Sequence, residues 1–170
     1  QKWGQHYVLT GHKVFATNGG VAGLYSVLAR TGENALSFFI VERPWNGVTI
    51  GKHEDKCGFR ESDTSDVLLE DVEVPEENLV GKEGDGFLIA MADFDMSRPA
   101  VAALSLGIAE GALDYATEYA GHRHAFGKPL IGHQPVQFML ADGLTLIEAG
   151  RGLMEKAALN FDAKQRNTTW

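Results

Sequence analysis

The sequence predicts an α+β protein, in which an antiparallel β-barrel or β-sandwich portion is followed by long antiparallel helices. Two observations carry this prediction. Short apolar stretches bounded by turn residues fill the chain to about residue 80, and near Gly84 the apolar pattern changes from a period of 2 to a period of 3.6. We therefore expect a β domain over residues 1–83 and a helical domain over residues 84–170.

The expected strands are short and rich in β-branched and aromatic residues. Residues 7–10 and 14–17 are separated by Gly11 and followed by Asn18-Gly19, which favours a hairpin. Further strands are expected at residues 24–29, 36–41, 48–50 and 67–74, the last stopped by Pro75. Strands of this length separated by turns predict an antiparallel arrangement.

Three helices are expected after residues 81–86. One covers residues 87–94, and a second starts at Ser97 as N-cap, with Pro99 tolerated in its first turn. The third follows Gln134-Pro135. One face of the second helix is expected to carry Val101, Leu104, Ile108, Ala112, Tyr115 and Tyr119, and one face of the third Val136, Leu140, Leu144, Ile147, Met154, Ala158 and Phe161.

Composition excludes several classes of protein. A formal net charge of −8 argues against a nucleic-acid partner. Cys57 is the only cysteine, so an intrachain disulfide is impossible; we expect a small packed residue in a reducing compartment. No apolar run is long enough to cross a bilayer. We expect a soluble protein of the cytoplasm, or of the mitochondrial matrix in a eukaryote.

Phe15 and Thr17 form the first candidate site. Residues two apart on a strand project from the same face, so a ring and a hydroxyl would lie side by side. Such a pair can stack on a flat heteroaromatic ring and hydrogen-bond to it. The alternative is a strand end with one core Phe and a Thr bonded to the following turn.

The second candidate site covers residues 95–99, Asp-Met-Ser-Arg-Pro. If a helix begins there, its free backbone N–H groups favour anions, and Arg98 adds a fixed positive charge. The alternative is an ordinary helix N-terminus with a solvated Arg.

The third candidate site is the connection between the long helices. Arg123, Phe126-Gly127 and Gln134 lie in it. A guanidinium can donate two parallel hydrogen bonds to a pyrophosphate. A Phe ring can form one side of a binding site, and a Gly lets the backbone come close to a bound group. A helix C-terminus alone would explain Arg123 but not the whole pattern. The histidines nearby lack metal-binding partners, so we expect no metal site.

Together, these stretches resemble the acyl-CoA dehydrogenases, flavoenzymes that oxidise fatty-acyl thioesters. The motifs are residues 13–20, Lys-Val-Phe-Ala-Thr-Asn-Gly-Gly, residues 95–99, and Arg-x-x-Phe-Gly with the Gln seven residues further on. The third is the most specific. The resemblance covers essentially all 170 residues but only the middle of the family's chain, so the helical bundle is expected to be truncated.

The resemblance implies FAD as cofactor. It implies that Phe15, at a position that is usually Trp, covers the flavin ring and that Thr17 bonds near flavin N5. Arg123, Phe126 and Gln134 are implied to hold the pyrophosphate and adenosine of the FAD of a neighbouring subunit, which makes a dimeric or tetrameric homo-oligomer a partner.

For the substrate, the resemblance implies that Asp95 and Arg98 lie beside acyl-CoA. It also implies electron-transfer flavoprotein as the electron acceptor. Some members carry the catalytic Glu where this chain has Ser97; the common alternative is a Glu beyond residue 170. The 170 residues alone should therefore be inert. An acyl-CoA oxidase and a non-catalytic interaction module that reuses this core are the alternatives.

Overall fold

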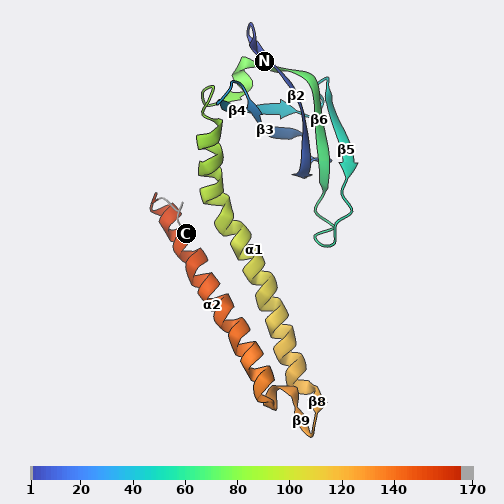
Figure 1. The fold of residues 1–170 in the computed structure, drawn as a ribbon, viewed down its shortest axis with the longest axis vertical. Coiled ribbons are helices and arrows are strands. Elements are labelled where there is room, and N and C mark those ends of the chain that lie inside the picture. Colours follow the sequence, from blue (N-terminus) through green and yellow to red (C-terminus); the bar gives the residue numbers. More distant parts are fainter. Residues whose placement is uncertain (1, 166–170) are drawn as a thin grey trace. The chain divides into compact units, whose positions relative to one another are not determined.

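A computed structural model describes residues 2–165 of the chain and confirms the α+β class (Figure 1). Strands occupy the first half, and two long helices the second. The chain divides into two compact units, a β unit that ends at Ala90 and a helical unit that begins at Met91. The domain boundary expected between residues 83 and 84 stays a prediction. No helix within the described residues is long and apolar enough to cross a membrane.

Four strands form the first sheet of the β unit. In spatial order they are β1 (Lys2–Trp3), β2 (His6–Thr17), β6 (Thr64–Pro75) and β5 (Val48–His53), and each pairing is antiparallel. Residues along the first half of β6 alternate between buried and half-buried, which is the pattern of a strand with one face on a core.

The second sheet has three strands, in the order β3 (Leu24–Arg30), β4 (Leu36–Glu42) and β7 (Leu79–Val80). These pairings are also antiparallel. A short 3₁₀ turn, η1 (Glu76–Asn78), leads from β6 into β7. The Asn78 side-chain amide donates to the Ile40 carbonyl at 3.0 Å, which ties this turn to β4.

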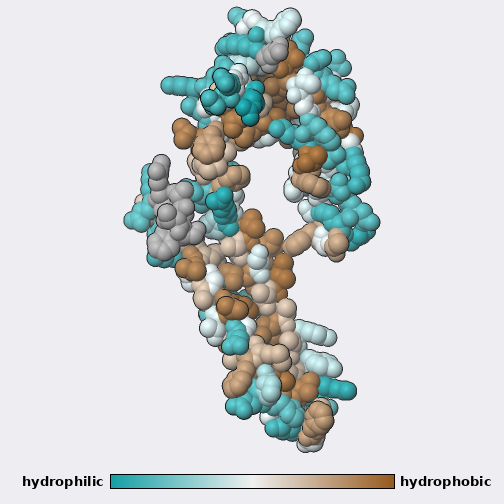
Figure 2. All heavy atoms as spheres, viewed as in Figure 1, coloured by the Kyte–Doolittle hydropathy of each residue, from teal (hydrophilic) through white to brown (hydrophobic). Residues whose placement is uncertain are grey.

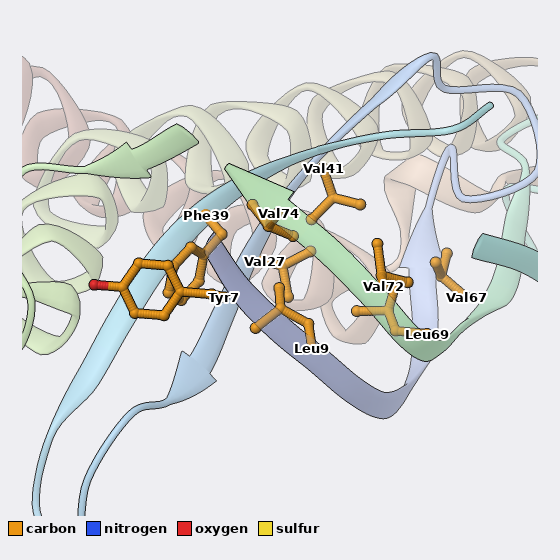
Figure 3. Close-up of a cluster of buried hydrophobic side chains, with 9 residues drawn as sticks. All are labelled: Tyr7, Leu9, Val27, Phe39, Val41, Val67, Leu69, Val72 and Val74. Atoms are coloured by element: carbon orange, nitrogen blue, oxygen red, sulfur yellow. The ribbon is translucent and has the colours of Figure 1, made fainter. Parts of the chain in front are cut away.

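A cluster of buried side chains from both sheets forms the core of the β unit (Figure 3). Phe39 is fully buried, and its ring centroid lies 4.8 Å from that of Tyr7. The Tyr7 hydroxyl donates to the Glu83 carboxylate at 3.0 Å, which satisfies the one polar atom of that side chain. The members are Tyr7, Leu9, Val27, Phe39, Val41, Val67, Leu69, Val72 and Val74.

Two local expectations for the β unit are wrong. Residues 7–17 lie in a single strand, β2, rather than in a hairpin, because its pairing with β6 absorbs the irregularities after Leu9 and Lys13 as register shifts. Gly11 therefore marks an irregular strand and not a turn. Cys57 is exposed, in the segment between β5 and β6, and is not a packed residue.

The expected break before Ser97 is also wrong. Helix α1 runs without interruption over Gly86–His122 and contains Pro99 in its interior. Proline removes one backbone hydrogen bond and crowds the preceding turn, at a cost of about 3 kcal/mol. The rest of a 37-residue helix offsets that cost. Residues 95–99 therefore do not begin a helix, and Ser97 is not its N-cap.

Helix α2 covers Gln134–Asp162, so it includes the Gln134-Pro135 pair that the predicted helix was expected to follow. A Cβ on Gly143 would lie 3.3 Å from Leu113, and one on Gly150 would lie 2.8 Å from Leu106. Both pairs are seven residues apart, in opposite directions along the two helices, so α1 and α2 pack antiparallel, as expected, with leucines placed over glycines. Arg151 and Glu110 bridge the same pair of helices at 2.9 Å.

Both helices expose apolar side chains. On α1 the apolar stripe is exposed: Val101, Leu104, Ile108, Tyr115 and Tyr119 are all more than half exposed. On α2, Ile147 is buried, whereas Leu144 and Phe161 are exposed. Figure 2 shows apolar surface along the helical unit. The face of α1 that meets α2 instead carries Leu106 and Leu113, so α1 is apolar on more than one side.

Candidate functional site

Phe15 and Thr17 lie near the end of β2, where the strand is irregular. The register with β6 shifts between Lys13 and Ala16, and Phe15 has a positive φ of 55°. The simple alternation that placed Phe15 and Thr17 on one face therefore does not apply there. Phe15 is 69% exposed, which rules out the alternative of a core Phe.

The turn after Thr17 is held by several hydrogen bonds. The Asn18 N–H donates to the Asp63 carbonyl at 2.8 Å, and the Gly20 N–H donates to the Asp63 carboxylate at 2.7 Å. The Tyr25 hydroxyl donates to the Gly19 carbonyl at 2.8 Å. Thr17 itself is exposed, and its hydroxyl makes no hydrogen bond to any other residue in the described part of the chain. The turn is thus hydrogen-bonded to the Asp63 region and to Tyr25, while the Thr17 hydroxyl beside it has no protein partner in the described residues.

Asp95 and Arg98 lie one turn apart inside α1. The Arg98 guanidinium carbon lies 5.1 Å from the centre of the Phe94 ring, a cation–π contact that orients the side chain. Because the segment is helical interior, its backbone N–H groups do not offer the anion site expected of a helix N-terminus. The guanidinium alone remains as a cationic group there.

Arg123 and Phe126 lie in the connection between α1 and α2, and Gln134 is the first residue of α2. Strands β8 (His124–Ala125) and β9 (Lys128–Pro129) form a hairpin whose two turn residues are Phe126 and Gly127. Their φ values of 50° and 82° are those of a type I′ turn. The hairpin presents Phe126 at its tip, where the side chain is 96% exposed.

Hydrogen bonds fix this connection at both ends. The Leu130 N–H donates to the Arg123 carbonyl at 2.8 Å, and a 3₁₀ turn, η2 (Leu130–Gly132), leads to His133 and into α2 at Gln134. His133 Nε2 lies 3.0 Å from the Ala125 carbonyl oxygen. The His133 ring also meets the Phe126 ring edge-on, with centroids 6.2 Å apart. An exposed aromatic ring is thus carried by a hydrogen-bonded connection.

Phe15 and Phe126 also have unusual backbone conformations. Non-glycine residues with positive φ include Phe15 and Phe126, and a bulky residue pays for this conformation. The type I′ turn accounts for the positive φ of Phe126, and the register shift between Lys13 and Ala16 accounts for that of Phe15; both rings are exposed. Phe59 shares the conformation and is also exposed, without a predicted role.

The structure therefore groups the predicted residues by unit. Phe15 and Thr17 lie together in the β unit. Asp95 and Arg98 lie on one helix, Arg123 and Phe126 lie in the connection between α1 and α2, and Gln134 begins α2. Arg123 is exposed and forms no ion pair with any residue from 2 to 165. A guanidinium without a protein partner can bind an external anion.

Sequence reasoning missed the residues that support these groups. Asp63 and His53 hold the turn after Thr17, and His133 supports Phe126. His53 is the last residue of β5, and Asp63 lies ten residues further on, just before β6, a spacing that carries no local signal. The one available hint is the Asn-Gly-Gly turn at residues 18–20, whose backbone N–H groups need acceptors from elsewhere.

The β unit contains a cavity of about 760 Å³. Residues of β2, β3 and β6 and Trp3 of β1 line it, and none of the predicted site residues does; its walls include Leu9, Lys13, Val27, Arg30 and Leu69. Lys13 Nζ donates to the Leu28 carbonyl at 2.7 Å and so links β2 and β3 across it.

Comparison with known proteins matches the two halves of the chain to two parts of one family. The profile described as "Acyl-CoA dehydrogenase, middle domain" matches residues 1–72. The profile described as "Acyl-CoA dehydrogenase, C-terminal domain" matches residues 84–169.

Individual relatives belong to the same family as these two profiles. Cyclohexane-1-carbonyl-CoA dehydrogenase of Geobacter metallireducens is 52% identical over 168 residues, which are 97% of this chain and 44% of that protein. The structure of butyryl-CoA dehydrogenase from Megasphaera elsdenii superposes with a TM-score of 0.92 and 46% identity, covering 96% of this chain and 44% of that one.

A third match is to a structure described as an electron transferring flavoprotein of Acidaminococcus fermentans, with a TM-score of 0.93 and 44% identity. It covers 98% of this chain and 45% of the other. The chain thus spans less than half the length of each of these relatives.

Proposed function

The chain belongs to the acyl-CoA dehydrogenase family, and on that premise we propose that it is part of an FAD-dependent enzyme that oxidises acyl-CoA thioesters. In the proposed reaction a carboxylate takes the proton α to the thioester carbonyl, and the β carbon loses a hydride, which leaves an α,β double bond. FAD, when bound, would supply the redox chemistry as the acceptor of that hydride, at its N5.

The observation that carries the proposal is the hairpin that presents Phe126. An aromatic side chain that is 96% exposed, in a strained conformation and on a hydrogen-bonded support, is suited to contact a second molecule. Arg123 lies at the base of the same hairpin with its guanidinium unpaired within the described chain. Such a group fits the pyrophosphate of FAD.

The β unit also fits a flavin. The exposed Phe15 ring can cover a flat ring system, and the Thr17 hydroxyl is available to hydrogen-bond to its edge. On the helical side, Arg98 and Asp95 are assigned to the acyl-CoA thioester. Gln134, at the first turn of α2, is assigned with Arg123 to FAD of a neighbouring subunit, so the enzyme is proposed to be a homo-oligomer.

The catalytic base is proposed to lie outside these 170 residues. Ser97, where some family members carry their Glu, has a hydroxyl that is too weak a base for this step. The 170-residue chain by itself is therefore proposed to be inactive. Electron-transfer flavoprotein is the proposed electron acceptor, and the cytoplasm, or the mitochondrial matrix of a eukaryote, the proposed location.

The test uses the full-length protein. Purified protein should carry about one FAD per subunit, and acyl-CoA should bleach the flavin absorbance under anaerobic conditions. A panel of straight, branched and cyclic acyl-CoA thioesters then defines the substrate. Full-length protein that holds no flavin and reduces no acceptor with any of them would contradict the proposal and favour a non-catalytic module. Rapid oxygen consumption during turnover would instead identify an oxidase.

A further inference from the structure

Asp63 contacts both ends of the turn that follows Thr17. Its carbonyl oxygen accepts from the Asn18 N–H at 2.8 Å, and its carboxylate Oδ2 accepts from the Gly20 N–H at 2.7 Å. The second carboxylate oxygen lies 2.9 Å from His53 Nδ1. One residue of the loop before β6 thus supplies two acceptors to a turn at the end of β2.

The close fit depends on glycine. A Cβ on Gly20 would lie 2.5 Å from His53 Cε1 and 3.1 Å from both Asp63 carboxylate oxygens. A Cβ on Gly19 would lie 2.8 Å from the hydroxyl of the buried Ser65. Two consecutive glycines therefore let the turn approach the Asp63 side chain and β6 closely enough for direct hydrogen bonds.

We propose that Asp63, oriented by His53, is a positioning residue that fixes the backbone on which Thr17 presents its hydroxyl to the flavin. This role rests on the proposed function, because Thr17 is assigned to flavin only there. Thr17 lies immediately before Asn18, so release of the Gly20 N–H loosens the segment that orients the Thr17 side chain. Asp63 itself does not touch the cofactor.

The charge state of Asp63 suits this role. The Gly20 N–H, followed by His53, holds the pKa of the Asp63 carboxyl below its usual range. The carboxylate therefore stays ionised at neutral pH and accepts both bonds. A charge-assisted bond of this kind is about twice as strong as a neutral one.

The principal test compares Asp63→Ala with Asp66→Ala in the full-length protein. Asp66 forms a second His–Asp pair, with His12, at the same 2.9 Å and with similar exposure, 16% against 18%. It accepts no hydrogen bond from the turn in the described structure. Asp66→Ala thus controls for the loss of a His–Asp pair.

Two readouts are measured on each variant. Hydrogen exchange of peptides that span residues 18–22 should accelerate about tenfold to a hundredfold in Asp63→Ala, the range expected for losing one bond to a charged group. The visible spectrum of the bound flavin should shift in the same variant. Asp66→Ala should change neither, and Asp63→Asn, which keeps a side-chain acceptor, should restore most of the protection.

His53→Ala is the second variant, and it should fold because its side chain is 64% exposed. It should change both readouts in the same direction as Asp63→Ala, and by less. Unchanged exchange in Asp63→Ala and His53→Ala would overturn the proposal. So would faster exchange with an unchanged spectrum of bound flavin, since the turn would then not control Thr17.

Failure of the proposed function gives a different result. If wild-type protein holds no flavin, both the proposed function and the positioning role of Asp63 are wrong. If wild type and Asp63→Ala both hold flavin and their flavin spectra are identical, only the positioning role is wrong.

Discussion

Gly47 lies in the turn between β4 and β5, where the backbone approaches β6 more closely than any other residue type permits. It has a φ of 84°, and a Cβ added there would lie only 2.1 Å from the Glu70 carbonyl oxygen. The Gly47 carbonyl also accepts from the Glu70 N–H at 2.9 Å. Gly47→Ala should therefore destabilise the β unit strongly.

Three contributions add up to the expected loss of folding stability in Gly47→Ala. A left-handed conformation costs an alanine about 1–2 kcal/mol. Displacing the backbone to remove the clash costs about 1–3 kcal/mol, as overpacking does in a core. Weakening the Glu70 hydrogen bond adds about 1 kcal/mol. We expect the free energy of unfolding to fall by about 3–6 kcal/mol.

Gly4→Ala is the matched control. Gly4 also has a positive φ, 64°, but nothing lies within 4 Å of an added Cβ. The cost of the left-handed backbone conformation is the only contribution expected there, so Gly4→Ala should lower the free energy of unfolding by about 1–2 kcal/mol. The difference between the two variants isolates the close approach of Gly47 to Glu70.

The assay is urea unfolding followed by tryptophan fluorescence, because Trp45 packs against the core cluster two residues from the substitution. Equal destabilisation by the two substitutions, within about 0.5 kcal/mol, would refute the reasoning, since it would mean that the backbone at Glu70 has room for a methyl group.

Three other outcomes are expected. In the full-length enzyme, Arg123→Ala should weaken FAD binding about tenfold to a hundredfold, since a bond to a charged group contributes about 1.5–3 kcal/mol; equilibrium titration measures this, and wild-type affinity would contradict the assignment. The Gly20 N–H and His53 lower the pKa of the Asp63 carboxyl in the folded state. The ionised carboxylate therefore stabilises the folded protein fully above the unfolded-state pKa of about 4, and this stabilisation is lost as the pH falls through the lower folded-state pKa. At pH 7, Asp63→Asn should therefore unfold at a lower urea concentration than wild type, and the difference between the two urea midpoints should shrink below about pH 4. A difference that does not change with pH would show that the ionised carboxylate does not contribute. The 170-residue chain alone should self-associate through the exposed apolar side chains of α1 and α2, and a stable monomer in light scattering would argue otherwise.

The sequence alone determined the class of fold and the main elements. Alternating apolar residues identified the strands, and 3.6-residue periodicity identified the helices, because both patterns are local consequences of which face is buried. A helix following Gln134-Pro135 was predicted, and α2 begins at Gln134 itself, with the proline in its first turn. The motif in the connection between the long helices could also be recognised from the sequence, because Arg123, Phe126 and Gln134 lie close together along the chain, whereas its hairpin was not predicted.

Other features depended on tertiary structure. Whether Pro99 starts a helix or lies inside one depends on the stability of the flanking turns, and here α1 continues through it. Which face of α1 meets α2 was decided by glycines 143 and 150, which accept leucine side chains from the other helix.

The support of the candidate site depended on tertiary structure as well. Asp63 and His53 hold the Thr17 turn only because β2, β5 and β6 are neighbours in one sheet. The bulge that turns Phe15 outward likewise arises from the register of β2 on β6. Contacts between residues this far apart in sequence follow from strand pairing, which no local pattern in the chain records.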